Sequence, residues 1–224
     1  MYVSQPVRTV LDNRPIYLSF GLAWLVGHGT FALSHGPNPL LDLPSFVPSA
    51  LLGVGLLAAM IVTTVVSMRA QRGATGREAV VGNLLGASWL IGFAALFFLI
   101  TALGSTLSPD TAATLWPTGS GLIVGLLYLA GGAAYRDVLQ YTLGAWLAVS
   151  STAALFLDGA SLYWALALAG GGSYLLAAAI EPRRIARRGG LRFQQRARPA
   201  SGRARSAFQL DGCALIAVPI HRCR

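Results

Sequence analysis

The chain has 224 residues, of which 54% are hydrophobic and 11% charged, and its mean hydropathy is +0.60. This apolar fraction is well above that of ordinary soluble domains and argues against a compact water-soluble enzyme. All 17 basic residues are arginine, so the chain has no lysine to hold nucleotide phosphates or to form a Schiff base. We therefore expect no cofactor, and any ATP hydrolysis that serves this protein takes place on another chain.

Six apolar stretches without Asp, Glu, Lys or Arg follow one another along the chain. Each is long enough to cross a bilayer core of about 30 Å at about 1.5 Å per residue. They cover Ile16–Ser34, Phe46–Met68, Val80–Leu103, Thr118–Tyr135, Leu139–Leu157 and Ala160–Ile180. We expect an all-α, polytopic integral membrane protein in which a six-transmembrane-helix bundle occupies residues 16–180, after a cytoplasmic N-terminal segment, residues 1–15.

Two details of the spans follow from local sequence. The first apolar stretch is longer than the core of a cleavable signal peptide, which is about 7–15 residues, so we expect it to remain as a span. Between the third and fourth stretches, Ser108-Pro109-Asp110 predicts a turn. The connecting loop is expected to run from Gly104 to Pro117, with the fourth span beginning at Thr118.

The arginines occur only in alternate connections. They precede the first stretch, follow the second and the fourth, and continue after the sixth, where eleven of the 17 lie. The other three connections contain no arginine and carry Asp42, Asp110 and Asp158. Because arginine-rich connections stay in the cytoplasm, this alternation predicts a multi-pass membrane protein whose two termini are both cytoplasmic.

The composition changes at Glu181 to Arg, Ala, Gly, Ser, Pro and Gln, so we expect residues 181–224 to form a basic, disordered cytoplasmic tail. No aromatic stacking platform accompanies these charges, so the lipid bilayer is the expected partner and nucleic acid is not. The arginines expected to anchor the sixth helix at anionic headgroups are Arg183, Arg184, Arg187 and Arg188. Residues 189–224 have two open interpretations, a genuine tail or a frame-shifted extension.

Three features inside the stretches are candidate sites. His28 is the only ionisable side chain there apart from tyrosines, and Asn83 lies early in the third stretch. Each has a structural interpretation, a hydrogen bond within the bundle, and a functional one, contact with a transported substrate. Gly170-Gly171-Gly172 permits either close helix packing or a hinge. No cysteine or acidic residue stands at ligand spacing from His28, so no metal site is expected.

Small residues at every fourth position allow helices to approach closely. Such pairs are Gly82 with Gly86, Gly121 with Gly125, and Gly144 with Ala148. Packing within one chain is the first interpretation of these pairs, and contact between copies in a homo-oligomer is the second.

The six stretches lack the charged side chains on which coupled carriers depend. Proton- and sodium-driven carriers, pumps and voltage sensors use charged residues inside the bilayer to take up or sense the driving ion. The six stretches contain no such residue. The sequence therefore favours a passive membrane subunit, which is neither an enzyme nor an ion-coupled carrier.

Several segments make the chain resemble a group of small six-span actinobacterial membrane proteins described as ABC transporter permeases. The resemblance covers about residues 8–188 and is carried by Ser45–Leu51, Met68–Gly76, Leu85–Trp89, Leu115–Leu122 and Ser151–Asp158. It implies a permease subunit in a bacterial plasma membrane that works with a separate cytoplasmic ATPase chain. The segment Asp158-Gly159 departs from many exporters, because it is too short for a re-entrant hairpin before the last helix.

If that resemblance holds, the loop from Arg69 to Ala79 is the best candidate for docking the ATPase. The residues expected to carry this contact are Arg69, Arg72, Arg77 and Glu78, and Gly73 and Gly76 allow the loop to turn tightly. The plainer interpretation is that the loop is a solvated, positively charged connector. A non-transporting membrane scaffold or regulatory protein is the alternative to a transport subunit.

Overall fold

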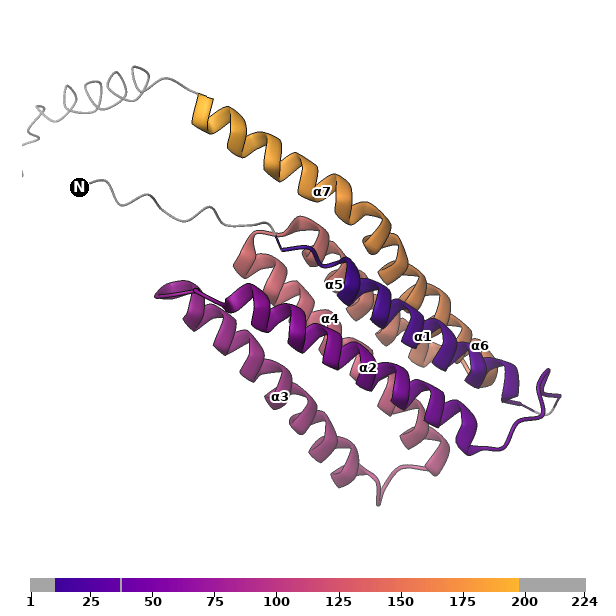
Figure 1. Ribbon diagram of the computed structural model, residues 1–224. Helices are drawn as coiled ribbons and strands as arrows, with labels where there is room; N and C mark the ends of the chain where they lie inside the picture. The colour runs from indigo at the N-terminus through magenta and orange to yellow at the C-terminus, as the bar shows by residue number, and fades with distance from the viewer. Residues whose placement is uncertain (1–10, 37, 198–224) are drawn as a thin grey trace, which may run out of the picture. The chain divides into compact units, whose positions relative to one another are not determined.

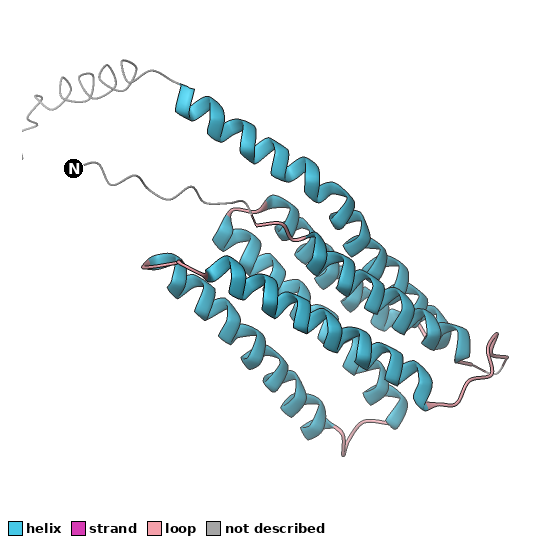
Figure 2. Ribbon diagram, viewed as in Figure 1, coloured by secondary structure: helices cyan, strands magenta, loops and turns pink. Residues whose placement is uncertain are grey.

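The structure is a computed structural model that describes residues 11–36 and 38–197, and in this part of the chain helices are the only regular secondary structure (Figures 1 and 2). The expected all-α class is confirmed. The elements are α1 (Arg14–Ser34), α2 (Phe46–Gln71), α3 (Arg77–Leu103), α4 (Pro109–Tyr135), α5 (Val138–Ala153), the 3₁₀ turn η1 (Ala154–Phe156), α6 (Gly159–Ala165), the π-helical segment η2 (Leu166–Gly171) and α7 (Gly172–Ala197).

Six helical segments in the described residues are long and apolar enough to cross a membrane, as the sequence predicts. Elements α6, η2 and α7 follow one another without a break and supply the sixth of them. The observed helices extend beyond most of the predicted spans by a few residues, because flanking polar residues continue the backbone hydrogen bonding of a helix past its apolar part.

The start of α4 differs from the prediction. The helix begins at Pro109, so the segment expected to be a loop up to Pro117 is largely helical. Ser108 is its N-cap, and the Ser108 hydroxyl accepts a hydrogen bond from the Thr111 N–H at 3.2 Å. Serine followed by proline at the first helical position is a helix start, since proline has no N–H to leave unsatisfied there. The turn predicted at Ser108-Pro109-Asp110 is therefore wrong.

The buried centre of the bundle is formed by α1, α4, α5 and the sixth span, whereas α2 lies against α1 and α3 lies against α4 (Figure 1). In the most apolar 18-residue segment of each helix, 56% of the residues are buried in α1, but only 6% in α2 and 11% in α3. The large hydrophobic side chains exposed on α2 and α3 are leucine, valine, isoleucine, methionine and phenylalanine. Such an outer surface suits contact with lipid.

A cluster of aromatic rings fills the centre. Tyr174 is fully buried, and its ring lies 5.7 Å from the rings of both Phe20 and Tyr128. The rings of Tyr17 and Trp24 lie 6.5 Å and 6.2 Å from it. These centroid distances are typical of packed aromatic pairs, so α1, α4 and α7 are joined by one continuous group of rings.

The contact between α4 and α5 is made by glycine. A Cβ atom added at Gly125 would lie 2.4 Å from the backbone nitrogen of Ala148, and one added at Gly144 would lie 2.4 Å from that of Leu129. The two helices therefore touch backbone to backbone, which favours packing within one chain for these small residues. A Cβ added at Gly86 meets nothing within 4 Å, whereas one added at Gly82 would lie 2.9 Å from Nε2 of Gln71 at the end of α2, so only Gly82 of this pair lies at a contact between helices of the chain.

The final helix continues well past the expected end of the sixth span at Ile180. Helix α7 runs to Ala197, so the disorder predicted from Glu181 is wrong for residues 181–197. Arginine, alanine and glutamine, which make up ten of these 17 residues, have good helix propensity. The chain divides into two units after Arg184, and each is described by itself. The rest of the predicted tail, residues 198–224, lies outside the described residues.

We predict that Gly125→Ala lowers the thermal stability of the detergent-solubilised protein, because its methyl group has to force α4 away from α5. Overpacking of this kind typically costs about 1–3 kcal/mol. Gly86→Ala is the matched control, since open space and the higher helix propensity of alanine should stabilise the protein by about 0.5–1 kcal/mol. Thermal unfolding followed by size-exclusion chromatography measures both, and equal behaviour of the two variants would contradict the proposed contact.

Candidate functional site

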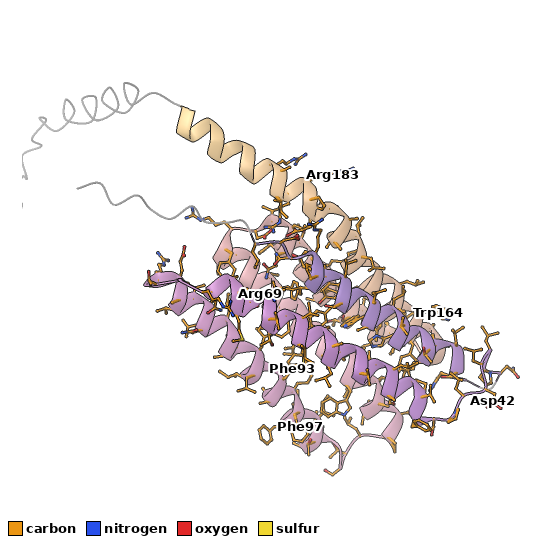
Figure 3. All side chains as sticks on the ribbon, in the orientation of Figure 1. Asp42, Arg69, Phe93, Phe97, Trp164 and Arg183 are labelled. Atoms are coloured by element: carbon orange, nitrogen blue, oxygen red, sulfur yellow. The ribbon has the colours of Figure 1, made fainter. Side chains whose placement is uncertain are left out.

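A buried group of charged and polar residues lies at the end of the bundle where α1 begins and α4 ends. We call this end the arginine end, because Arg69 and Arg183 lie towards it, whereas Asp42 lies at the other end (Figure 3). The group, named here the charge cluster, consists of Asn13, Asp137, Glu181 and Arg184. Glu181 is 0% exposed and Asp137 4%, and the Arg184 side chain is 10% exposed.

The Arg184 guanidinium joins three separate parts of the chain. Its Nη1 donates to Asp137 Oδ2 at 2.5 Å, in the link between α4 and α5. Its Nε donates to Glu181 Oε2 at 2.6 Å, one turn earlier in α7, and Nη2 forms a second contact with the same carboxylate. Nη2 also donates to the carbonyl of Leu11 at 2.7 Å, ahead of α1. One side chain therefore ties the starts of α1 and α5 to α7.

Both carboxylates of the charge cluster also lie at helix N-termini. Glu181 Oε1 accepts a hydrogen bond of 2.9 Å from the backbone N–H of Asn13, the N-cap of α1. Asp137 is the N-cap of α5, and its Oδ1 accepts from the backbone N–H of Gln140 at 3.3 Å. A helix N-terminus acts as roughly half a positive charge. Two such ends and one guanidinium offset two carboxylates, so the cluster is close to electrically balanced.

Sequence reasoning missed the charge cluster. Asp137 was assigned to a connecting loop and Glu181 to the tail, and the prediction that Arg184 contacts lipid headgroups is wrong because its side chain is turned into the bundle. Arg183, its neighbour, is exposed. Two signals were present in the sequence. Asp137 immediately precedes a helix, as an N-cap does, and Glu181 and Arg184 have the three-residue spacing of an ion pair on one helix face.

His28 is buried in α1 towards the opposite end. Its Nδ1 lies 3.2 Å from the carbonyl oxygen of Trp24, and its ring lies 5.1 Å from the Trp24 ring. The other ring nitrogen, Nε2, has no hydrogen-bond partner among the described residues. Asn83 lies on an exposed part of α3, near the arginine end. The structure therefore does not bring His28 and Asn83 into one site.

The three glycines of the sixth span are used mainly for close packing. A Cβ at Gly170 would lie 2.3 Å from the Trp24 ring, and one at Gly171 would lie 2.8 Å from the backbone nitrogen of Leu25. Gly170 and Gly171 also end the π-helical segment η2. Gly172 meets nothing within 4 Å. The glycines therefore allow α1 to lie directly against the sixth span.

Side chains bind two carbonyl groups in this π-helical region. The indole Nε1 of Trp146, on α5, donates to the carbonyl of Ala169 at 2.9 Å. The hydroxyl of Ser173 donates to the carbonyl of Gly170 at 2.7 Å. Carbonyls displaced from regular helical bonding need such partners in a membrane. The irregular segment is thus held by hydrogen bonds from α5 and from its own helix.

The predicted docking loop forms a tight turn between α2 and α3. Gly73 and Gly76 have positive φ angles of +85° and +59°, which confirms that glycine is needed for this turn. Three side chains around the turn are exposed, those of Arg69, Arg72 and Arg77, and the side chain of Glu78 is partly buried. The three guanidinium groups therefore flank one short turn at the arginine end.

Comparison of this chain with protein-family models, with curated proteins and with solved structures finds no match. Within residues 11–36 and 38–197, no three His, Cys, Asp or Glu side chains are grouped so as to hold a metal ion. The function is therefore inferred from the chain's own residues and their geometry.

We predict that Arg184→Met strongly destabilises the protein, because it leaves two buried carboxylates without their cation. Removing one partner of a buried ion pair typically costs about 3–5 kcal/mol. Arg183→Met, a change at an exposed neighbour, is the control and should have little effect. Thermal unfolding in detergent provides the measurement.

A triple variant separates loss of charge balance from loss of packing. If unpaired charge causes the instability, Arg184→Met combined with Asp137→Asn and Glu181→Gln should recover much of it, since no buried charge then remains in the charge cluster. Stability of Arg184→Met equal to that of Arg183→Met would refute the role given to this guanidinium.

Proposed function

We propose that the chain is a permease-like membrane subunit of an ABC-type transporter and that a separate cytoplasmic chain hydrolyses the ATP. The observation that carries this proposal is the turn between α2 and α3, which has exposed arginines in the last turn of α2, in the turn itself and at the start of α3, namely Arg69, Arg72 and Arg77. A short turn with exposed arginines suits contact with an acidic surface on another protein.

A separate source of energy is favoured by the charges within the bundle. The charge cluster is the main buried ionic group of the described residues, and its carboxylates already bind Arg184 and the two helix N-termini. Carboxylates that are fully engaged in this way are poorly suited to load and release a driving ion. With no lysine for a nucleotide site, the chain depends on a partner for energy.

Unpartnered polar atoms in the interior support transport of a solute. Within the described residues, three buried side-chain atoms have no hydrogen-bond partner: Tyr17 Oη, His28 Nε2 and Ser151 Oγ. Buried polar atoms are nearly always paired, and unpaired ones inside a membrane protein are candidates for contact with substrate or water. They come from α1 and α5, which line the centre of the bundle.

The alternative, a non-transporting scaffold or regulatory protein, is favoured by a different observation. Large side chains fill the centre, and Tyr17, Tyr174, Leu147, Leu162 and Leu166 are each less than 2% exposed. Together with the backbone contact between α4 and α5, this packing suits a protein that binds partners without opening.

Co-purification from native membranes tests the proposal. We predict that an ATPase chain is retained by the wild-type protein and that Arg69→Gln with Arg72→Gln lowers its recovery roughly tenfold, equivalent to ~1.4 kcal/mol. Arg183→Gln removes an exposed arginine at the same end and should leave recovery unchanged. ATP-dependent flux into vesicles that contain both chains completes the test. Purification of the chain alone, with no flux, would favour the scaffold.

A further inference from the structure

Large apolar side chains are exposed on and beside two short links at the end of the bundle where Asp42 lies, opposite the arginine end (Figure 3). The first link joins α1 to α2, and the second joins η1 to α6. We call these side chains the apolar rim, and they are those of Leu40, Leu41, Phe46, Phe156 and Leu157. Leu40 is 78% exposed and Phe156 89% exposed. Grouped apolar exposure of this extent marks contact with a membrane or with another protein.

The first link returns to the end of α1 after leaving it. The backbone N–H of Leu41 donates to the carbonyl of Leu33 at 3.0 Å. Leu33 lies in the last turn of α1, which is long and apolar enough to span a membrane. Leu41 and its neighbour Leu40 therefore lie beside the end of a span, at the level where the bilayer core meets the headgroups.

The second link is too short to leave this level. Element η1 ends at Phe156 and α6 begins at Gly159, so only two residues separate two candidate spans. The backbone N–H of Leu157 donates to the carbonyl of Ala154 at 3.0 Å, which holds the link against the end of η1. Phe156 and Leu157 are therefore confined to the same end of the bundle as the first link.

Aromatic contacts hold the two links near each other. The Phe31 ring, in α1, stacks on the Tyr163 ring, in α6, with 5.0 Å between their centroids. The His35 ring, at the start of the first link, lies 5.3 Å from the same tyrosine ring. Tyr163 lies in the second turn of α6, directly after the second link. The two parts of the apolar rim therefore belong to one region of the surface.

Both links have the same short pattern, two large apolar residues followed by an exposed aspartate. The two instances are Leu40-Leu41-Asp42 and Phe156-Leu157-Asp158. Segments at a membrane surface place apolar side chains among the acyl chains while their polar residues stay in water. Neither link contains an arginine, so their contact with lipid does not depend on an anionic headgroup.

The apolar rim is also continuous with a surface that suits lipid. Phe46 is the first residue of α2, and the exposed side chains along that helix are leucine, valine, isoleucine and methionine. Few residues of α2 are buried in the rest of the chain. This continuity favours lipid over a water-soluble partner as the occupant of the rim.

We propose that the apolar rim inserts into the interfacial layer of the leaflet at the Asp42 end of the bundle. Leu40 and Phe156 contact the upper parts of acyl chains, whereas Asp42 and Asp158 remain in water. The rim anchors the α1–α2 and α5–α6 links to lipid of any headgroup. This assignment depends on insertion of the bundle in a membrane and not on the transport proposal, because a scaffold would be anchored in the same way.

The test uses the full chain with Cys213→Ser and Cys223→Ser, reconstituted in phosphatidylcholine nanodiscs so that both membrane faces are accessible. Single cysteines replace Leu40 or Phe156 in the rim and Asp42 or Asp158 beside it, and each is labelled with bimane. Two quenchers are compared, phosphatidylcholine brominated on the upper acyl chain and iodide in the buffer. Labels at Leu40→Cys and Phe156→Cys should be quenched by brominated lipid about threefold more strongly than those at Asp42→Cys and Asp158→Cys, and by iodide more weakly.

Thr75→Cys, in the turn at the arginine end, is the control for an exposed link without large apolar residues, and its label should be quenched by iodide. Addition of phosphatidylglycerol to the nanodiscs should leave the quenching at Leu40→Cys and Phe156→Cys unchanged, since no arginine lies on these links. Iodide quenching at these two positions equal to that at the two aspartate positions would overturn the proposal and place the rim in water, as a surface for a soluble partner. Protection of both positions from both quenchers would also overturn it and indicate that protein covers the rim.

Discussion

The bundle depends most on how it satisfies buried charge at the arginine end. Transfer of an ion from water into the interior of a protein costs several kcal/mol even after relaxation, and an ion pair repays this only with near-ideal geometry and further hydrogen bonds. Arg184 meets both conditions, since its nitrogens contact Asp137, Glu181 and the carbonyl of Leu11. Each carboxylate then accepts a backbone N–H from the start of a helix. The relative positions of α1, α5 and α7 at this end follow from these bonds.

Elsewhere in the bundle, contact between helices depends on shape. Lipid is as apolar as leucine, so apolar side chains gain little by moving from lipid to a neighbouring helix. Close approach of backbones, aromatic stacking and a few hydrogen bonds between helices remain as sources of attraction. The glycines of α4 and α5 allow the close backbone approach, and the rings around Tyr174 provide the aromatic stacking. The bond from Trp146 to the carbonyl of Ala169 is a hydrogen bond between helices. Many hydroxyl groups make no such contribution, since Thr63, Ser88 and Thr142 donate to carbonyls of their own helices.

The sequence was sufficient for the number of long apolar helices and for most of their limits, because the absence of charge over a long apolar run has one common physical cause. It was insufficient for the charge cluster. Asp137 and Glu181 both lie outside the apolar stretches, and their burial results from the way α1, α5 and α7 come together, which depends on contacts distant in the sequence. The start of α4 could have been predicted, since serine followed by proline is a helix N-terminus as well as a turn.

The same contacts determine which helices of the bundle can move apart at the lowest cost in free energy. The glycine contacts of α4 with α5 leave no room for either helix to slide, and the charge cluster holds the ends of α1, α5 and α7 together. Helix α2 is also held closely against α1, because a Cβ atom at Gly27 would lie 2.9 Å from the Cα atom of Leu52, whereas little of α3 is buried in the rest of the chain. Under the proposed function, a force applied by a partner at the turn between α2 and α3 acts on one helix that is fixed against α1 and on one that is held more loosely. A scaffold would use the same division differently, with a rigid centre and an outer pair of helices available to lipid or to another protein.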